Sequence, residues 1–518
     1  MKPQQPSTPV RSTPQAGECL ARRVRASLPA LGVIAMAIAS SVVVSLGGCA
    51  SSAGIASSAQ TLAPLSIGLD AGVTTPAFAT DWWHGFGDAA LTDLVERALA
   101  DNPSLKVAQA RLARAQAAVS GAQAADGPQV NAGLDVTRQR FSATSIYPPP
   151  LGGGIYTLGT AQVGAAWELD FFGRNRAAIE TAVGSQRAAQ ADVQAARNVL
   201  ASSVARTYVQ LGRLFEQREV ATRSLKQRDE TLSLIKQRVQ GGLDTNVELR
   251  QGEGALPETR QQIEQLDEQI MLTRHALAAL TAQPPNALDG LDARLRTVQA
   301  VPLPAAVPAD LLGRRADVTA ARWRIEAATS DVKSAAAQFY PNINLTAFVG
   351  LASIGLDRLV RSGSEQYGAG PAIRLPIFDS GRLRANLRGK TADLDAAIES
   401  YNGAVLDAVH DAADQIGALR SVDRQQVEQV RAQAAAESAY DLATQRYKAG
   451  LGTYLTVLNA ESAVLNQRRQ AADLKARALD VQIALIRALG GGYADDARVS
   501  GGSADDAVDA TRTAHAGP

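Results

Sequence analysis

Two stretches of this 518-residue chain resemble each other and set its architecture: Gln-Arg-Val-Gln-Gly-Gly-Leu-Asp-Thr at residues 237–245 and Gln-Arg-Tyr-Lys-Ala-Gly-Leu-Gly-Thr at residues 445–453. Each follows a long segment without proline and precedes a second long segment of mixed polar and apolar residues. Glycine is typical of the end of a helix, and threonine of the start of the next one. The sequence therefore predicts two helical hairpins, one in each half of the chain.

The segment before the first turn, residues 173–240, carries apolar residues at heptad spacing. Its two seams consist of Val204, Leu211, Leu225, Leu232 and Val239, and of Val193, Leu200, Leu214, Ala221 and Ile235. Seams three and four residues apart are the a and d positions of a coiled coil, which Arg218 and Arg228 interrupt here. At a rise of 1.5 Å per residue this helix is about 100 Å long, which exceeds the size of a globular domain.

Each predicted turn carries its own helix signals. The first helix stops at Gly241 and Gly242, and the chain restarts at Thr245, which with Glu248 fits a capping box. In the second turn Thr453 is the expected cap. Because both hairpins are antiparallel, their two turns are expected at one far end of the molecule.

The similarity extends beyond the turns and indicates an internal duplication. Residues 102–131 align with residues 315–344 without a gap. Each half reads helix, strand, loop, strand, very long helix, turn, long helix. We therefore divide the chain into a first repeat at 88–282 and a second at 309–489, joined by a linker at 283–308 whose prolines prevent a continuous helix.

Each repeat is expected to contain one β-hairpin, at about 128–172 and about 341–378. Polar and apolar residues alternate along these segments, which gives each strand one uniformly apolar face. Such strands suit a wall between lipid and water; the alternative is a soluble hairpin pair with one face on a core. Pro371 would require a sheet edge or a bulge. Known membrane barrels need about eight strands or more, so a spanning chain must pool strands with copies of itself.

The N-terminal region has the features of a bacterial lipoprotein signal. An apolar stretch, residues 28–46, follows three arginines and leads into Leu46-Gly47-Gly48-Cys49. This pattern predicts a leader and signal peptide at 1–48, lipidation of Cys49, and a lipidated N-terminal segment at 49–87. An uncleaved membrane span is the alternative, because nineteen largely apolar residues can just cross a bilayer. Cleavage would place the mature chain in the periplasm or the outer membrane.

Composition excludes several classes of partner and site. The net charge is +1, which gives no electrostatic reason to expect nucleic acid. Once the leader is removed only Cys49 remains, so a disulfide framework and a cysteine-based metal site are excluded. Aromatic residues make up only 4% of the chain, which favours long, closely packed helices over a round core. The tail at 490–518, rich in Gly, Ala and Asp, is expected to be disordered.

No pattern in the sequence predicts catalysis. Gly389-Lys390-Thr391 resembles the end of a phosphate-binding loop but lacks its first glycine and lies in a predicted helix. His84, His275 and His410 are far apart and have no cysteine or histidine at ligand spacing. We therefore expect no catalytic residues, no metal and no cofactor other than the covalent lipid.

Several motifs, in order and partly doubled, resemble the outer membrane efflux factor family of TolC-like ducts, in its lipoprotein branch. The resemblance covers residues 81 to 489. Its marks are Trp82-Trp83 with Phe86 and Asp88, Asn102 within residues 98–105, Trp167-Glu168-Leu169-Asp170-Phe171-Phe172-Gly173-Arg174, Asp310-Leu311-Leu312-Gly313-Arg314-Arg315, Leu375-Pro376-Ile377-Phe378, and Arg446-Tyr447 with Gly450.

The resemblance implies a mixed α/β membrane protein of the outer membrane that extends into the periplasm. Four strands from each chain of a homotrimer would close a 12-stranded transmembrane β-barrel, continuous with a long α-helical coiled-coil barrel. The implied function is the passive outer membrane channel of a tripartite efflux pump that exports small toxic compounds. Its partners would be a periplasmic adaptor protein, an inner-membrane pump and outer membrane lipid, with no nucleic acid.

The resemblance also assigns roles at the turns. The implied adaptor-contact residues are Gly241, Gly242, Thr245, Gly450, Gly452 and Thr453. The implied periplasmic gate consists of Tyr447, Arg446, Thr456 and Asn459. Because Thr456 and Asn459 stand where relatives carry acidic residues, Arg446, Asp244, Glu248 or Glu461 could supply other pairings, or these side chains could form a solvated helix face.

Two other functions remain compatible with the sequence. The same duct could serve type I protein secretion, although the lipidation signal and the Trp82-Trp83 region favour small-molecule efflux. A lipid-anchored coiled-coil scaffold without a pore is the third possibility. The sequence does not identify the exported compounds, the pump or the adaptor.

Overall fold

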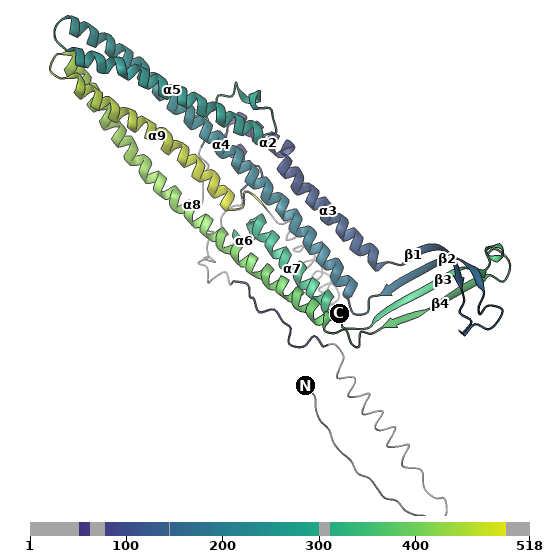
Figure 1. Ribbon diagram of the computed structural model, residues 1–518. Helices are drawn as coiled ribbons and strands as arrows, with labels where there is room; N and C mark the ends of the chain where they lie inside the picture. Colours follow the sequence, from purple (N-terminus) through teal and green to yellow (C-terminus); the bar gives the residue numbers. More distant parts are fainter. Residues whose placement is uncertain (1–50, 63–77, 145, 300–310, 494–518) are drawn as a thin grey trace, which may run out of the picture.

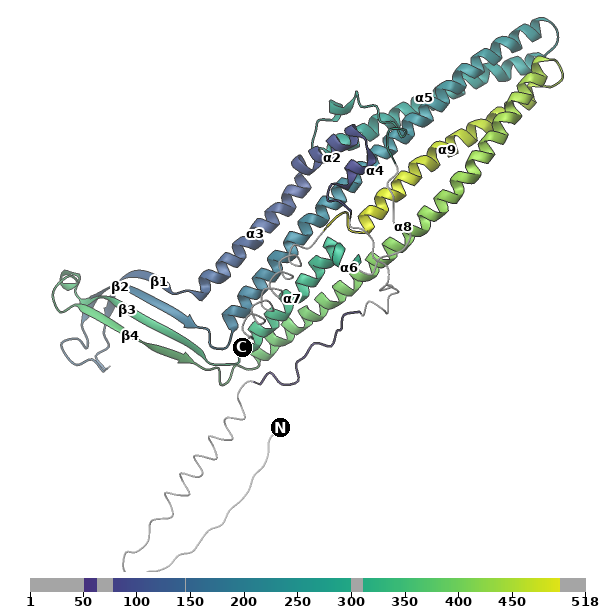
Figure 2. The same ribbon diagram turned by 180° about the vertical axis from the view of Figure 1, so that it is seen from behind.

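The computed structural model describes residues 51–62, 78–144, 146–299 and 311–493. The predicted signal peptide, Cys49 and residues 494–518 of the predicted tail lie outside these residues. Long helices form one end of an elongated molecule, and a β-sheet projects from the other end (Figure 1). The view from behind shows the same division (Figure 2). None of the described helices combines the length and apolar character needed to cross a bilayer.

The two repeats have closely similar elements. The first consists of η2 (Trp82–Phe86), α2 (Ala89–Asp101), α3 (Pro103–Asp126), β1 (Gln129–Arg140), β2 (Ile155–Leu169), α4 (Arg174–Gln240) and α5 (Asn246–Leu280). After η3 (Pro285–Leu288), the second consists of α6 (Leu311–Arg314), α7 (Ala316–Ala337), β3 (Asn342–Ile354), η4 (Leu356–Arg358), β4 (Glu365–Arg374), α8 (Arg382–Lys448) and α9 (Tyr454–Ala488). α4 and α8 each contain 67 residues, and α5 and α9 each contain 35.

The heptad pattern of α4 agrees with its burial. Val204, Leu211 and Ile235 are fully buried, and Leu214 and Leu232 are nearly so. α4 packs against α5, and α8 against α9, so that the two hairpins run side by side to a common tip (Figure 1). These contacts explain how helices far longer than a globular domain stay ordered, because each presents an apolar stripe to its neighbour.

The middle of the molecule holds the main hydrophobic core. Trp82, Trp83 and Phe86 pack there with α2, α4 and α5. The chain between η3 and residue 299 returns to this core, where Leu295 is buried. A Cβ atom at Gly212 of α4 would lie 2.8 Å from Leu295 Cδ2, so this glycine permits the close approach. The described part of the predicted linker is therefore packed rather than free.

The four strands form one antiparallel sheet in the order β1-β2-β3-β4. The predicted hairpin positions are correct, but two strand ends differ from expectation. Phe171 lies beyond β2, which ends at Leu169, because Asp170 instead accepts a hydrogen bond at 2.8 Å from the Arg176 N–H at the start of α4. Ile377 likewise lies beyond β4, which ends at Arg374 shortly before Pro376.

Candidate functional site

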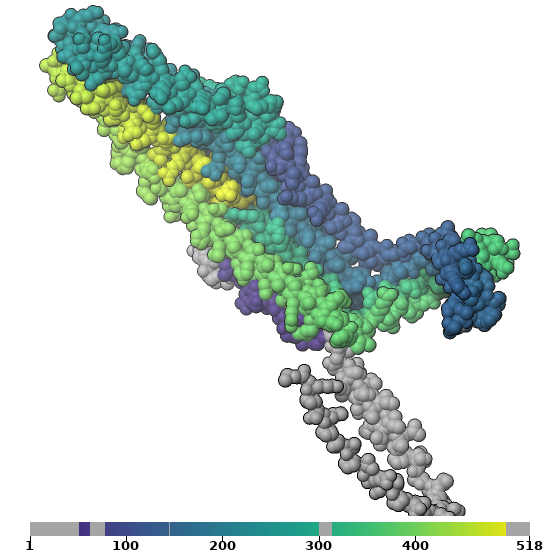
Figure 3. All heavy atoms as spheres, in the orientation of Figure 1, coloured from purple at the N-terminus to yellow at the C-terminus, as the bar shows by residue number. Residues whose placement is uncertain are grey.

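The sheet has one apolar face. Paired residues on neighbouring strands point to the same face, and the register assigns one face these large apolar side chains: Val130, Leu134, Val136, Val163, Leu345, Val349, Tyr367 and Ile373. They keep between 43% and 84% of their surface exposed. The sheet projects beyond the helices (Figure 3). The opposite face carries polar residues such as Asn131, Asp135, Gln162, Asn344 and Gln366.

The outer edges of β1 and β4 pair with no other described strand. Pro371 lies on β4, a terminal strand of the described sheet, so of the two places that the sequence allowed, an edge or a bulge, the structure has the edge. The Ala352 N–H donates to the Ser364 carbonyl at 2.8 Å, and hydrogen-bonded pairs alternate along an antiparallel ladder. The Leu345–Pro371 pair is therefore not hydrogen-bonded, and the proline nitrogen faces outward. Pro371 removes no donor from the β3–β4 ladder.

The two helical hairpins end in turns of the same backbone geometry. Gly242 has φ 71° and Gly450 has φ 76°, in the left-handed region that favours glycine. The Leu243 N–H donates to the Arg238 carbonyl, and the Leu451 N–H donates to the Arg446 carbonyl, both at 2.8 Å. The matching geometry explains why glycine recurs at the equivalent place in both turns.

A polar network joins the two turns. The Arg238 Nε donates to Asp244 Oδ2 at 2.9 Å, and Arg238 Nη1 donates to the Tyr447 carbonyl at 3.2 Å. The Tyr447 hydroxyl donates to Asp244 Oδ2, and the Arg238 guanidinium lies 4.6 Å from the centre of the tyrosine ring. Tyr447 is 1% exposed. The charges of the first hairpin thus hold the tyrosine of the second.

This network fixes the protonation states of its members. The hydrogen bond from Arg238, with a second one from Tyr447, lowers the pKa of Asp244 below its ordinary value. Burial and the neighbouring Asp244 carboxylate raise the pKa of Tyr447. At neutral pH the aspartate is therefore ionised and the phenol protonated, which the observed hydrogen bond requires.

The other predicted gate residues lie apart from this network. Arg446, Thr456 and Asn459 are exposed, and Arg446 makes no side-chain hydrogen bond or ion pair with the described residues. Among the suggested alternatives, Asp244 pairs with Tyr447, whereas Glu248 binds Thr245. Sequence reasoning missed Arg238, although its place six residues before Asp244, across a turn, was a usable signal for their ion pair.

Both predicted cap residues stand at the N-cap position of their helices, but only Thr245 caps with its side chain. The capping box is present in the first hairpin: Thr245 Oγ1 accepts from the Val247 N–H at 3.1 Å, and Glu248 accepts from the Thr245 N–H at 2.9 Å. Thr453 is the N-cap residue of α9, as predicted, but its side chain makes no capping hydrogen bond. Its hydroxyl instead lies 3.1 Å from that of Thr456, which replaces the glutamate of the capping box.

A buried ion pair joins the hairpins farther from the turns. Arg228 Nε donates to Glu461 Oε1 at 3.0 Å, and Arg228 Nη1 donates to Thr259 Oγ1 at 2.9 Å. The Arg228 side chain is 12% exposed and that of Glu461 8%. The heptad pattern marked Arg228 only as an interruption, because its partner lies 233 residues away and no local signal connects the two.

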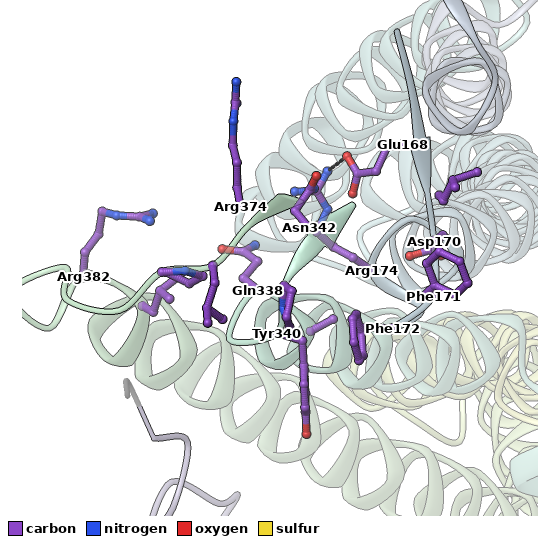
Figure 4. A pocket seen from close by; sticks show the side chains of 16 residues that line it. Glu168, Asp170, Phe171, Phe172, Arg174, Gln338, Tyr340, Asn342, Arg374 and Arg382 are labelled. Atoms are coloured by element: carbon purple, nitrogen blue, oxygen red, sulfur yellow. Dashed lines mark hydrogen bonds and ion pairs between the residues drawn. The ribbon is translucent and has the colours of Figure 1, made fainter. Parts of the chain in front are cut away.

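A pocket of about 400 Å³ lies where the strands meet the long helices (Figure 4). Glu168 and Arg174 form an ion pair there, and Phe172 stacks on Tyr340 with ring centres 4.9 Å apart. Arg374 and Arg382 line it but point away from its other side chains (Figure 4). The ion pair joins the end of β2 to the start of α4, and the ring pair joins the segment before α4 to the segment after α7.

The enzyme-like motifs are structural in character. Gly389-Lys390-Thr391 lies inside α8, where Lys390 Nζ is 2.8 Å from Asp331 Oδ2. His84 is 3.4 Å from the carboxylates of both Asp81 and Glu96. Over the described residues no three His, Cys, Asp or Glu side chains lie together as metal ligands would.

Comparison with known proteins assigns the family. A family model for outer membrane efflux proteins matches residues 94–283 and 307–491. The multidrug resistance outer membrane protein MdtQ of Escherichia coli O6:H1 is 34% identical over 426 residues, which covers 80% of this chain and 88% of MdtQ. The chain belongs to the outer membrane efflux protein family. This efflux protein is also 31% identical over 450 residues to OpmQ, a pyoverdine export outer membrane protein of Pseudomonas aeruginosa, covering 84% and 94% of the two chains.

A solved structure gives the same assignment. This efflux protein matches the outer membrane protein VceC of Vibrio cholerae with a TM-score of 0.76 and 36% identity, covering 80% of this chain and 99% of VceC. The predicted family, efflux function and outer membrane location are thereby confirmed. The family is one of passive channels rather than enzymes.

Proposed function

We propose that three copies of this chain form the outer membrane duct of a tripartite efflux pump. The exposed apolar face of the sheet, together with its two open edges, carries this proposal. Described residues cover this apolar face only near Gly159, where Leu356 and Leu359 pack, so the rest of it needs another apolar environment. Four strands are too few to close a barrel. Three copies supply twelve strands, with the apolar face toward lipid and the polar face toward water.

The backbone of the two open edges is compatible with such closure. The Phe141 N–H donates to the Gly154 carbonyl at 2.9 Å, so alternation directs the backbone groups of Val130, Leu134 and Val136 to the outer edge of β1. The same alternation directs the backbone groups of Tyr367 and Ile373 to the outer edge of β4; Pro371 faces this edge too and offers a carbonyl but no N–H, so the new ladder would lack one donor. The side chains of these residues lie on the apolar face, so β4 of one copy can pair with β1 of the next while that face remains continuous.

The helices would continue this barrel into the periplasm. Twelve long helices from three copies would form a tunnel, since α4 and α8 each extend about 100 Å at 1.5 Å per residue. At each turn an apolar pair is exposed: Leu243 (69%) and Val247 (61%) in the first, Leu451 (71%) and Leu455 (55%) in the second. These equivalent pairs support an adaptor contact around Gly241, Gly242, Thr245, Gly450, Gly452 and Thr453.

The network of Arg238, Asp244 and Tyr447 would act as the periplasmic gate. It holds the two turns of one copy together, so opening would require its hydrogen bonds to break. Arg446, Thr456 and Asn459 remain proposed gate residues through contacts between copies. Lipidation of Cys49 would anchor each copy to the membrane, and no other cofactor is proposed. The energy for transport would come from the inner-membrane pump.

The proposed cargo is small toxic compounds. This rests on the names of two relatives, one a multidrug resistance protein and the other a pyoverdine export protein. Deletion of the chain should sensitise cells to several unrelated toxic compounds. Sensitivity unchanged for all of them, with loss of one secreted protein, would favour type I secretion instead.

Conductance in planar bilayers tests the duct itself. Trimers should give single channels, and Tyr447→Phe should raise their open probability, with Asn459→Ala as a companion variant at the exposed surface. Trimers that give no channels even after both changes would indicate a scaffold without a pore.

Adaptor cross-linking tests the turns. Gly450→Val places a β-branched residue at φ 76° and should abolish cross-linking while trimers persist. Gly403→Val is the matched control, because this glycine lies inside α8 and a Cβ atom there meets nothing within 4 Å. Equal cross-linking of both variants would remove the turn from the adaptor contact.

A further inference from the structure

The first described residues, 51–62, form a strap that lies along α8 (Figures 1 and 3). At one end of this strap, Arg384 of α8 donates to the carbonyls of Ser51 and Ala53. At its other end, the Leu62 N–H donates to Asn402 Oδ1, and Asn402 Nδ2 donates to the Gln60 carbonyl, both at 2.9 Å. The strap is thus fixed at both ends to the same helix.

Asp395 holds the middle of the strap. Its carboxylate accepts from the Ser57 hydroxyl at 2.6 Å, from the Ser58 N–H at 3.1 Å and from the Ala59 N–H at 3.3 Å. These hydrogen bonds lower the pKa of Asp395, the one from Ser57 most. The carboxylate therefore stays ionised at neutral pH and binds the strap with charge-assisted hydrogen bonds.

The chain around the start of α8 has the composition of a membrane surface. We call residues 375–388 the junction. Its first part exposes Leu375 (49%), Ile377 (62%) and Phe378 (84%). Arginines follow: Arg382 and Arg388 are exposed, and neither makes a side-chain hydrogen bond or ion pair with the described residues. Apolar side chains next to unpaired arginines suit the boundary between acyl chains and phosphate groups.

The strap brings the expected lipid to this same place. Ser51 follows Cys49 by two residues, and an extended chain covers at most roughly 7 Å over two residues. A lipid on Cys49 would therefore begin close to Arg384, which binds the Ser51 carbonyl. Two features that are far apart in the sequence, the lipidation signal and the junction, thus point to one depth in the membrane.

We infer that the junction binds the phospholipid headgroups of the periplasm-facing leaflet, and that the docked strap sets this depth. The inference rests on the proposed barrel and on the proposed lipidation of Cys49. Its partner is a lipid surface with anionic phosphate groups, which Arg382 and Arg388 would contact. Asp395 and Asn402 act at a distance, by holding the strap.

A single fluorescent label measures the depth of the junction. Since Cys49 would be the only cysteine left and would be acylated, Phe378→Cys adds the only free thiol. In trimers reconstituted into phosphatidylglycerol vesicles, a label at 378 should lose fluorescence to a headgroup-linked quencher. A label at Val349→Cys in the sheet should respond to an acyl-chain quencher, and one at Val427→Cys, farther along α8, to neither. If the label at 349 is quenched and the label at 378 is not, headgroup binding by the junction is contradicted while the proposed barrel stands. If neither label is quenched, the proposed barrel itself is contradicted.

A double variant tests the strap. Asp395→Ala with Asn402→Ala should release residues 51–62, making them cleavable by protease, and should reduce headgroup quenching at 378. Asp393→Ala is the matched control, because its carboxylate lies 3.9 Å from Lys390 and binds no strap residue. Unchanged quenching in trimers whose strap has become cleavable would show that the strap does not set the depth.

The arginines are tested by lipid preference. Arg382→Gln with Arg388→Gln should reduce binding to phosphatidylglycerol vesicles relative to phosphatidylcholine vesicles. Arg424→Gln removes an exposed charge from the same helix 36 residues beyond Arg388 and should change nothing. An undiminished preference in the double variant would overturn the assignment of these arginines to lipid phosphate.

Discussion

The two helical hairpins share their backbone dimensions and differ in their polar contacts. Residues 208 positions apart are equivalent, so Arg446 corresponds to Arg238 and Tyr447 to Val239. Asp244, however, corresponds to Gly452, and only the first turn therefore has an acid beside its arginine. Duplication has kept the helix lengths and the turn geometry, whereas the polar residues have diverged. The first hairpin now supplies the charges that hold the second, and the reverse contact is missing.

The other end of the hairpins shows a complementary case. The Asn102 Nδ2 donates to the Leu280 carbonyl at 2.8 Å at the end of α5, and Arg315 Nη1 donates to the Ala488 carbonyl at 3.2 Å at the end of α9. Different side chains thus satisfy equivalent carbonyls, because the last carbonyls of a helix lack intrahelical donors. Where the backbone requires a donor, duplication has preserved the contact and changed only the residue.

The largest expected difference between the hairpins concerns Glu461 and its equivalent, Glu253. Glu461→Ala would leave the buried Arg228 with only the exposed Glu258, 3.7 Å away, as a charged partner, and should lower the free energy of unfolding by about 3 kcal/mol. Glu253 is 37% exposed and pairs only with Arg250, so Glu253→Ala should cost about 0.5 kcal/mol or less. Thermal and guanidinium unfolding of the solubilised protein measure both.

A double replacement separates the two causes of this effect. If the cost of Glu461→Ala comes from an uncompensated charge, then Arg228→Leu with Glu461→Leu should recover most of the stability, because buried ion pairs are often no more stabilising than apolar pairs. A double variant as unstable as Glu461→Ala would indicate that packing, rather than charge, sustains this site.

The next effect concerns the contact between the turns. Asp244→Asn and Tyr447→Phe each weaken a hydrogen bond of a charged group, worth about 1.5–3 kcal/mol. The open probability in planar bilayers should therefore rise roughly tenfold, since about 1.4 kcal/mol corresponds to that factor. Arg446→Gln, at the equivalent of Arg238, breaks no contact within one copy, so it should raise the open probability less, and only through the proposed contacts between copies. A larger effect of Arg446→Gln than of Asp244→Asn would show that contacts between copies, rather than the network within one copy, control opening.

Acid should break the same contact, but only at low pH. The pKa of Asp244 is lower in the folded protein than in the unfolded chain. The stabilisation that ionised Asp244 gives to the closed contact is therefore complete above the unfolded pKa of about 3.9, and it is lost as the pH falls through the still lower folded pKa. Open probability should thus stay constant from pH 7 to pH 5 and rise below about pH 4. Asp244→Asn should lack this rise; an unchanged rise would assign it to other carboxylates.

Local patterns predicted much of this fold. The long helices, the two turns and the β-hairpins follow from periodicity, glycine and proline, which act over a few residues. The strand ends at Leu169 and Arg374 were less predictable, because Phe171 and Ile377 continue the apolar alternation while the backbone has already turned toward a helix.

Contacts between the repeats were the least predictable. Arg228 and Glu461 come from different halves of the chain, as do Arg238 and Tyr447, and neither pair has a sequence spacing that announces it. The strap was missed for the same reason, since Ser57 meets Asp395 across 338 residues. Sequence periodicity indicates that a side chain departs from the apolar seam, but the partner is defined only once the helices are packed.

The smallest expected difference between the hairpins lies at their two threonines. Thr245→Ala removes the cap of α5 and should lower the free energy of unfolding by about 1 kcal/mol. Thr453 provides no side-chain cap to α9, so Thr453→Ala should lower the free energy of unfolding by only a few tenths of a kcal/mol, about 0.1 to 0.3. Thr456→Glu would restore the capping-box pattern in the second hairpin and should stabilise α9. Hydrogen exchange of the first turns of α5 and α9 resolves these changes locally; equal protection after both alanine replacements would mean that packing of the turns, rather than capping, orders the helix starts.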